Sequence, residues 1–154
     1  MHTFLDKYSV FMTSLLIKDK WFEQSTQSQS LIELCHQIDV SKIYSLEENS
    51  VELDVIFENT LLDPAFQVVQ WLGYEYPTII YHHGNNERPF DYRLSSKNTF
   101  RSILYTVRQE VKANLITIRA PFHTGTLKQF TSKMKDLHHF TQMIATSTNV
   151  IQSL

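Results

Sequence analysis

The stretch "PTIIYHHGNNERPFD", residues 77–91, decides the fold. Its first part, from Pro77 to Tyr81, is apolar and β-branched on successive residues. A continuous apolar run of this length is typical of a strand that is buried on both faces, as strands of a parallel sheet are. The run ends in two histidines and a glycine, and glycine lets the backbone turn sharply. We therefore expect a buried parallel strand, followed by a tight loop that presents many polar groups.

The elements that follow predict the partner of this strand. Residues 95–111 have apolar side chains at helical spacing, and "ANLITIRAPFH", residues 113–123, begins as a second apolar strand. Another helix is predicted from about Leu127 onward, with a possible break near "TSTN" at residues 146–149. This strand–helix–strand–helix order requires parallel strands and a right-handed crossover. The carboxyl ends of such strands share one edge, so "HHGNN" and "RAPFH" should be neighbours in space.

An antiparallel hairpin is predicted upstream. "VELDVIF", residues 51–57, alternates and places Val51, Leu53 and Val55 on one face of a strand. "FQVVQWLG", residues 66–73, reads as a second strand, and Asp63-Pro64 supplies the turn between the two. Strands this close in sequence pair in antiparallel fashion. The predicted fold class is α/β, an antiparallel hairpin followed by a parallel β-α-β-α unit.

The first 49 residues have a helical texture. Residues 1–24 carry apolar side chains at helical spacing, and Ser30 with Glu33 fits a capping box that begins a second helix. We divide the chain into an N-terminal helical extension, residues 1–49, and an α/β domain, residues 50–154. The apolar side of the second helix is predicted to comprise Leu31, Ile32, Leu34 and Ile38.

Composition excludes several functions. The 154 residues are 42% hydrophobic and 19% charged, which favours one globular domain with a real core. The formal net charge of -2 offers no basic footprint for nucleic acid. No apolar run is long enough to span a bilayer, and no secretory signal is recognisable, so we expect no membrane partner. Cys35 is the single cysteine, which excludes an intrachain disulfide and favours a cytoplasmic location.

The polar loop itself has two interpretations. A glycine directly after a buried strand can expose an array of backbone N–H groups that stabilises a developing oxyanion. Alternatively, "HHGNN" is a strand-end turn whose histidines and asparagines satisfy local backbone groups.

A resemblance favours the first interpretation. "PTIIYHHGNNERPFD", the helix after it and "NLITIRAPFH" resemble the N-terminal half of an α/β-hydrolase of the serine-esterase or peptidase type, over about residues 50–154. In that family a strand ends in a His-Gly element whose following N–H groups form half of the oxyanion hole. The resemblance implies that Gly84 and Asn85 are the oxyanion-hole donors and that His83 shapes the turn through its ring hydrogen bonds. The residues implied to line the pocket or shape its loops are His82, His83, Asn86, Arg119, Pro121, Phe122 and His123.

The sequence also departs from this family. Its nucleophile lies in a G-x-S-x-G element, yet the residues two positions after the three glycines are Glu75, Asn86 and Leu127. In the family the acid and the catalytic histidine follow the nucleophile, so we assign no catalytic residue and no cofactor. We expect the N-terminal part of a serine hydrolase, which cleaves a small-molecule ester or amide when complete and is inactive as given. The alternative is a non-catalytic binding or interaction module on a hydrolase-derived scaffold.

Two further expectations concern the same loops. His82, His83 and His123 could ligate a metal, but adjacent residues at a strand end point to opposite faces and no carboxylate completes a site, so we predict no metal. A Glu87-Arg88 or Arg88-Asp91 contact could hold the loop.

The predicted edge of the sheet carries a consequence for assembly. In the hydrolase strand order, the strand Pro77–Tyr81 lies between the strand of "NLITI" and the nucleophile strand. Without the latter it becomes an open apolar edge, and such edges pair with other chains unless they are covered. We expect a homo-oligomer through Pro77–Tyr81, or coverage of this edge by the N-terminal helices.

Overall fold

The computed structural model describes residues 21–40, 50–84 and 87–154. Most of the helix predicted for residues 1–24 lies outside the described residues, and its last part, residues 21–24, forms a turn instead of a helix. Trp21 and Phe22 pack against Phe140, with ring centroids 6.2 Å and 5.6 Å from it. Within the described ranges, no helix has the length and apolar character needed to cross a membrane.

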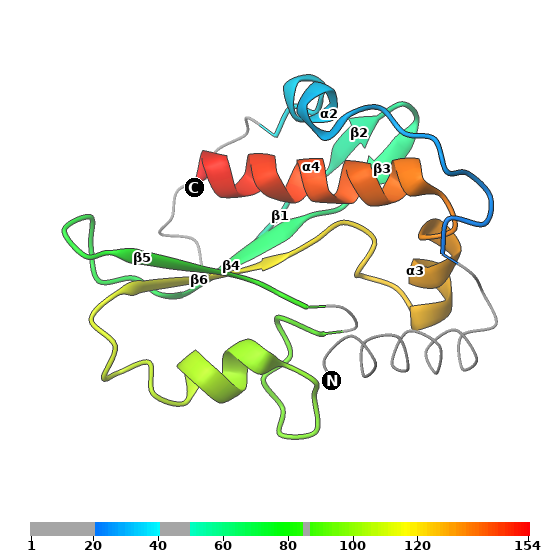
Figure 1. The fold of residues 1–154 in the computed structure, drawn as a ribbon. Helices are drawn as coiled ribbons and strands as arrows, with labels where there is room; N and C mark the ends of the chain where they lie inside the picture. Colours follow the sequence, from blue (N-terminus) through cyan, green and yellow to red (C-terminus); the bar gives the residue numbers. More distant parts are fainter. Residues whose placement is uncertain (1–20, 41–49, 85–86) are drawn as a thin grey trace, which may run out of the picture.

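The described residues form a mixed four-stranded sheet in the order β1-β4-β6-β5 (Figure 1). The antiparallel part consists of β1 (Ser50–Glu52) paired with β4 (Ala65–Gln70), which also pairs antiparallel with β6 (Asn114–Arg119). The parallel part is β5 (Thr78–His82) beside β6, with Ile80 opposite Ile116. The α/β class, the antiparallel pair and the parallel pair are therefore confirmed.

The hairpin differs in detail from the prediction. The single strand expected over residues 51–57 is broken into β1 and β2 (Val55–Phe57), and β2 pairs with β3 (Thr60–Leu62) in a separate two-stranded sheet. Val51, Leu53 and Val55, which were predicted to share one face of a strand, are all buried. The turn between β2 and β3 is made by Glu58 and Asn59, both with positive φ, of 48° and 62°. Positive φ at both central residues is the turn type favoured in hairpins, but the usual glycine signal is missing from it.

Helices cover both faces of the sheet (Figure 1). On one face lie α2 (Leu31–Gln37) and α4 (Leu137–Ser153), and on the other lies the π-helical segment η1 (Arg101–Tyr105). The capping box of α2 is confirmed, because the Glu33 N–H donates to the Ser30 hydroxyl at 3.2 Å and the Ser30 N–H donates to the Glu33 carboxylate at 3.1 Å. The predicted apolar side of α2 is only half right: Leu34 and Ile38 are buried, but Leu31 and Ile32 are 41% and 70% exposed.

The other two helices differ from the predicted lengths. The helix expected over residues 95–111 begins later, because Asn98 accepts from the Arg101 N–H at 2.9 Å and so caps its start, and residues 106–110 form turns. The long helix expected from Leu127 is two helices, α3 (Leu127–Lys133) and α4. The break lies at Asp136, whose side chain accepts from the His138 N–H at 2.8 Å, and not near "TSTN".

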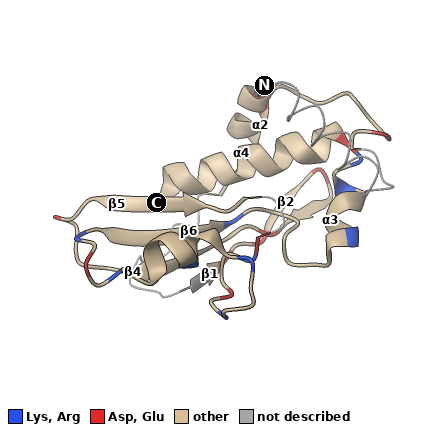
Figure 2. Ribbon diagram, turned by 60° about the horizontal axis from the view of Figure 1, so that its bottom comes forward, with Lys and Arg blue, Asp and Glu red and all other residues tan. Residues whose placement is uncertain are grey.

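The core lies on both faces of β6. One hydrophobic cluster joins Leu34 of α2, Ile116 and Ile118 of β6 and Val150 of α4. Residues 21–40 therefore share a core with the sheet. α4 carries no Lys, Arg, Asp or Glu along its whole length, and it lies between α2 and the sheet (Figures 1 and 2). A second cluster, around Phe100 and including Tyr81, packs on the opposite face of the sheet.

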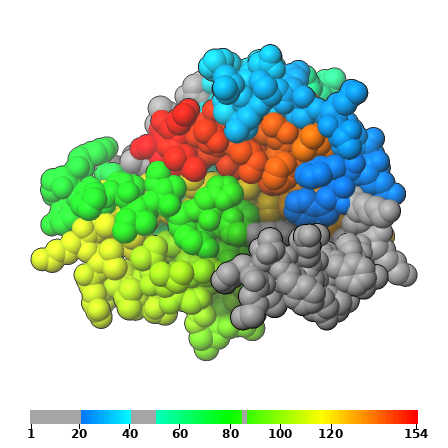
Figure 3. Space-filling model, in the orientation of Figure 1, coloured from blue at the N-terminus to red at the C-terminus, as the bar shows by residue number. Residues whose placement is uncertain are grey.

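β5 is the outermost strand of the sheet. The prediction that this strand is buried on both faces is wrong, since Thr78, Ile79 and His82 are exposed and Ile79 has 38% of its surface accessible. Ile80 packs toward the cluster of α4 and Tyr81 toward Phe100, so each face has partial cover. Among the described strands, only β6 pairs with β5, and the band of surface that includes β5 runs across the front of the molecule below α4 (Figure 3).

Candidate functional site

The loops that follow β5 and β6 meet at one end of the sheet. The Ala120 N–H donates to Nε2 of His83 at 3.0 Å. The rings of His83 and His123 contact each other edge to face, with centroids 4.3 Å apart. The predicted proximity of "HHGNN" and "RAPFH" is confirmed for their described residues.

His83 ties the two loops together. Its side chain lies in the interior and the residue is 5% exposed. Because a backbone N–H can only donate, Nε2 of His83 is the acceptor for Ala120, and Nδ1 carries the proton that it donates to the Gly84 carbonyl at 2.8 Å. Burial lowers the pKa of His83 to about 4, so the ring is neutral at pH 7.

The Gly84 carbonyl is fixed by two donors. Besides the His83 ring it accepts from the Glu87 N–H at 3.2 Å. Asn85 and Asn86, predicted as an oxyanion-hole donor and a pocket residue, lie outside the described residues.

The Glu87 carboxylate turns back toward β5 and η1. It accepts from the Tyr81 hydroxyl at 3.0 Å and from the Thr99 hydroxyl. Burial by itself would raise the pKa of Glu87, but these hydrogen bonds outweigh it and lower the pKa. The predicted contact of Glu87 with Arg88 is therefore wrong, because two hydroxyl groups already occupy the carboxylate.

The other predicted ion pair of this loop is also wrong. Asp91 forms a two-pronged pair with Arg93, at 2.9 Å and 2.6 Å, and not with Arg88. Arg93 lies two residues after Asp91 and its N–H also donates to that carboxylate, so the local turn favours it over Arg88. The Arg88 side chain is exposed and has no ion pair with a described residue.

The loop after β6 is held by a residue from far away in the sequence. The Asp63 carboxylate accepts from the Phe122 N–H at 2.7 Å and from the Thr124 hydroxyl at 2.5 Å. Phe122 has a φ of 67°, a conformation that costs a non-glycine residue about 1–3 kcal/mol. The sequence marked Asp63 only as the first residue of a turn, because nothing in the local pattern points to a loop 59 residues later.

Two predicted site residues have structural partners in this loop. Arg119 extends its guanidinium to the Glu52 carboxylate of β1 and donates to the Asp63 carbonyl at 3.2 Å. Pro121 is buried, and its carbonyl accepts from Nδ1 of His123 at 2.9 Å. Burial lowers the pKa of His123, as it does for His83.

His82 is exposed and stacks on its neighbour. Its ring lies 9° from parallel with that of His83, with centroids 5.2 Å apart. The expectation that the two side chains point to opposite faces is wrong, because β5 ends at His82 and strand alternation does not continue into the turn. The described residues contain no group of three or more His, Cys, Asp or Glu side chains that could hold a metal ion.

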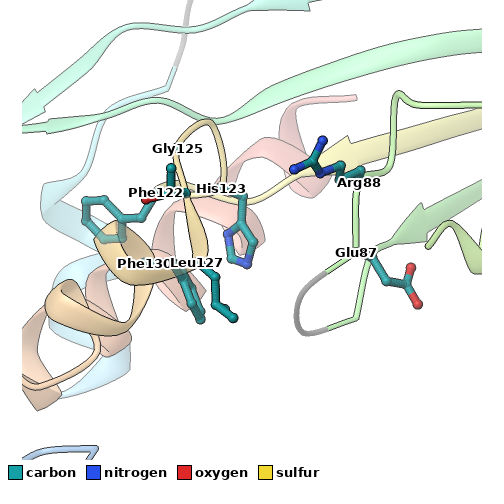
Figure 4. Close-up of a pocket in the computed structure, with 8 residues that line it drawn as sticks. Glu87, Arg88, Phe122, His123, Gly125, Leu127 and Phe130 are labelled. Carbon is teal, nitrogen blue, oxygen red and sulfur yellow. The ribbon is translucent and has the colours of Figure 1, made fainter. Parts of the chain in front are cut away.

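A small pocket opens between the two loops (Figure 4). Its volume is about 90 Å³, and its walls include Arg88 from the first loop and His123, Leu127 and Phe130 from the second loop and α3. Phe122 also lines it, while the buried His83 is not part of the lining and contacts the ring of His123. The sequence reasoning did not identify Leu127 and Phe130 as pocket residues, because their helical spacing reads as an ordinary core face.

Comparison of the chain with protein-family models, with curated proteins and with solved structures finds no match.

Asp63→Ala tests the clamp on the second loop. Removal of the carboxylate leaves the Phe122 N–H without its acceptor, and we expect a loss of about 2 kcal/mol in the free energy of unfolding, measured with urea. Asp54→Ala is the matched control, because Asp54 is an exposed residue in the same segment and should change stability by less than about 0.5 kcal/mol. Equal effects of the two substitutions would contradict the clamp.

The pH dependence of stability tests the neutral state of His83. Its pKa is lowered on folding, so the unfolded chain binds more protons between pH 6.5 and about 4. The free energy of unfolding should fall as pH decreases through this window, with up to about 3 kcal/mol from His83. His83→Asn should be less stable at pH 7.5 but show a flatter profile, whereas His82→Asn should keep most of the decline. An unchanged profile in His83→Asn urea titrations contradicts this assignment.

Proposed function

We propose that the chain is the N-terminal part of a serine α/β-hydrolase, which in its complete form cleaves an ester or amide by acyl transfer. The observation that carries this proposal is the anchoring of the Gly84 carbonyl by the buried His83 ring. With the Gly84 carbonyl held toward His83, the proposal keeps Gly84 and Asn85 as the donors to the oxyanion, as the resemblance implies.

The strand order supports the same proposal. In the hydrolase order, the strand before the His-Gly element lies between the next strand of the chain and the nucleophile strand. Here β5 is parallel to β6 and forms the outer edge of the described sheet, and the proposal assigns the nucleophile strand to the position next to it. The helices on both faces fit a doubly wound sheet, in which ligands bind beyond the carboxyl ends of the strands.

In this proposal the first loop performs one part of acyl transfer. As a nucleophile attacks the scissile carbonyl, its oxygen gains negative charge, and preorganised N–H donors at about 2.7–3.1 Å stabilise that charge. Neutral His83 holds the Gly84 carbonyl and adds no charge of its own. The second donor and the nucleophile belong to a G-x-S-x-G element, which these 154 residues lack. We infer that the chain as given does not turn over substrate.

A non-catalytic binding module is the second candidate. It is favoured by the pocket beside His123, because none of the described residues that line this pocket is a nucleophile with an adjacent base. The DNA directly downstream discriminates between the two. A G-x-S-x-G element shortly after codon 154, in frame or frameshifted, supports the hydrolase proposal, and an unrelated sequence supports the module.

Ester turnover tests the proposal directly. Purified protein of these 154 residues should hydrolyse p-nitrophenyl esters no faster than buffer. Turnover that a serine-directed phosphonate abolishes would overturn the inactivity of this chain. If the downstream frame supplies a G-x-S-x-G element, the extended protein should be active, and His83→Asn in it should lower kcat by about 100- to 1,000-fold. An unchanged kcat in that variant would refute the role of the loop.

The place of β5 as the outermost of the described strands leads to a proposal about partners. The strand has no charged residue and no proline between Thr78 and His82, and its register with β6 is regular. Native edge strands are usually protected by such residues or by bulges. We propose that β5 pairs with another strand, from a second copy when no nucleophile strand occupies the position.

Ile79→Lys tests this proposal about the edge. A lysine on the edge strand opposes strand pairing, so it should shift the protein toward monomer in concentration-dependent light scattering. Ile56→Lys is the matched control, since Ile56 is 76% exposed on the separate hairpin and should leave association unchanged. A wild-type protein that remains monomeric, with rapid solvent exchange of the β5 amides, would exclude the proposal.

A further inference from the structure

Arg88 has an anchored backbone, and its cationic side chain has no described counter-ion. Its N–H donates to the Lys97 carbonyl at 2.9 Å, which holds the backbone of the loop. The two nearest carboxylates in the sequence are occupied, Glu87 by the hydroxyls of Tyr81 and Thr99 and Asp91 by Arg93. The exposed guanidinium is therefore available for an anion from outside the described chain.

The pocket next to Arg88 is apolar on its opposite side. Figure 4 shows Leu127 and Phe130 together beyond the His123 ring, while the Glu87 carboxylate points away from them. Phe130 is buried and its ring lies 4.4 Å from that of His123, so this wall is rigid. Leu127 is 54% exposed and forms the accessible rim. A volume of about 90 Å³ is small and limits the apolar group to a single ring or a short chain.

We propose that this pocket binds a small carboxylic acid with an aryl or short alkyl group, its carboxylate on Arg88 and its apolar group against Leu127 and Phe130. A guanidinium binds a carboxylate through two parallel hydrogen bonds, and the apolar wall adds burial of the hydrocarbon part.

The surroundings of Arg88 favour a carboxylate over a phosphate. A second hollow of about 230 Å³ lies beside Arg88, and its lining includes Arg93 and Lys97. Arg93 is already paired with Asp91 by two hydrogen bonds. That hollow also lacks an apolar wall, since its described lining is Arg, Asp, Ser and Lys. A single available guanidinium beside an aromatic ring matches one negative charge joined to a hydrocarbon group.

This inference does not rest on the hydrolase proposal. Binding of a carboxylate needs neither a nucleophile nor an oxyanion hole, so it can be measured on the 154-residue protein in the absence of any turnover. A protein without esterase activity that binds the acid supports this inference alone.

Phenylacetate is the probe, and its neutral isostere phenylacetamide is the matched ligand. Binding is measured by NMR titration at low ionic strength, on wild type, Arg88→Gln and Arg93→Gln. We expect phenylacetate to bind wild type with a Kd of about 10 mM or below, as a ligand of this size should. Phenylacetamide should bind at least about 10-fold more weakly, as should phenylacetate to Arg88→Gln. Arg93→Gln should bind as wild type does.

A second variant separates the apolar wall from the charge. Leu127→Ser alters only the rim and should weaken phenylacetate several-fold while leaving acetate unchanged. Inorganic phosphate should bind no more tightly than acetate. The proposal is overturned if phenylacetate and phenylacetamide bind equally, if phosphate binds more tightly than phenylacetate, if Arg93→Gln loses as much affinity as Arg88→Gln, or if no binding is detected at 10-fold above the expected Kd.

Discussion

The hydrogen bond from the Ala120 N–H to the His83 ring is the interaction on which the site depends. The ladder between β5 and β6 ends where His82 pairs with Ile118, and beyond that point the two strands lead into loops. The imidazole continues the connection past the last rung, because one ring nitrogen receives the N–H of one loop and the other donates to the carbonyl of its own loop. Only a neutral ring can do both. Burial of His83 and the geometry of the loops therefore depend on one another.

A second hydrogen bond also holds the loop after β6. Asp63, between β3 and β4, holds Phe122 in its positive-φ conformation through a charge-assisted hydrogen bond. Such a bond is worth about 1.5–3 kcal/mol, which is comparable to the conformational cost of about 1–3 kcal/mol at Phe122. The loop after β6 is therefore held at two points, by the Ala120 N–H that donates to the His83 ring and by the Phe122 N–H that donates to the Asp63 carboxylate. Two independent anchors within three residues leave the loop little freedom to move relative to the sheet.

The sequence predicted those parts of the fold that depend on local signals. β6, the capping box of Ser30 and the meeting of the two loops follow from apolar runs, capping residues and the direction of parallel strands. The apolar run of β5 predicted burial on both faces, and Ile80 and Tyr81 do pack on opposite faces. The exposure of β5 arises at its edge, which depends on the strand that lies alongside it, and β5 is the outermost described strand. A run of side chains carries information about faces and none about edges.

The site was less predictable because its decisive contacts are competitions between side chains. The sequence places Glu87, Arg88 and Asp91 within reach of one another, and charge alone would pair them. The fold instead brings Tyr81 to Glu87 and a turn brings Arg93 to Asp91, so both carboxylates are taken and Arg88 is not. Choices of this kind depend on three-dimensional proximity to groups that a linear pattern does not reveal.

These competitions give the site its electrostatic character. The three histidines of the two loops each direct Nδ1 at a backbone carbonyl, and burial, which is only partial for His82, lowers the pKa of each ring. With its pKa lowered to about 4, His83 orients its loop without charging it at neutral pH. The carboxylates nearby are satisfied by hydroxyls, by an arginine or by backbone N–H groups. The charge left without a partner among the described groups of these loops is the positive charge of Arg88. A site whose described acids are occupied and whose buried His83 is neutral favours anions over cations. The two proposals draw on this same property through different groups, a backbone N–H in one and a guanidinium in the other.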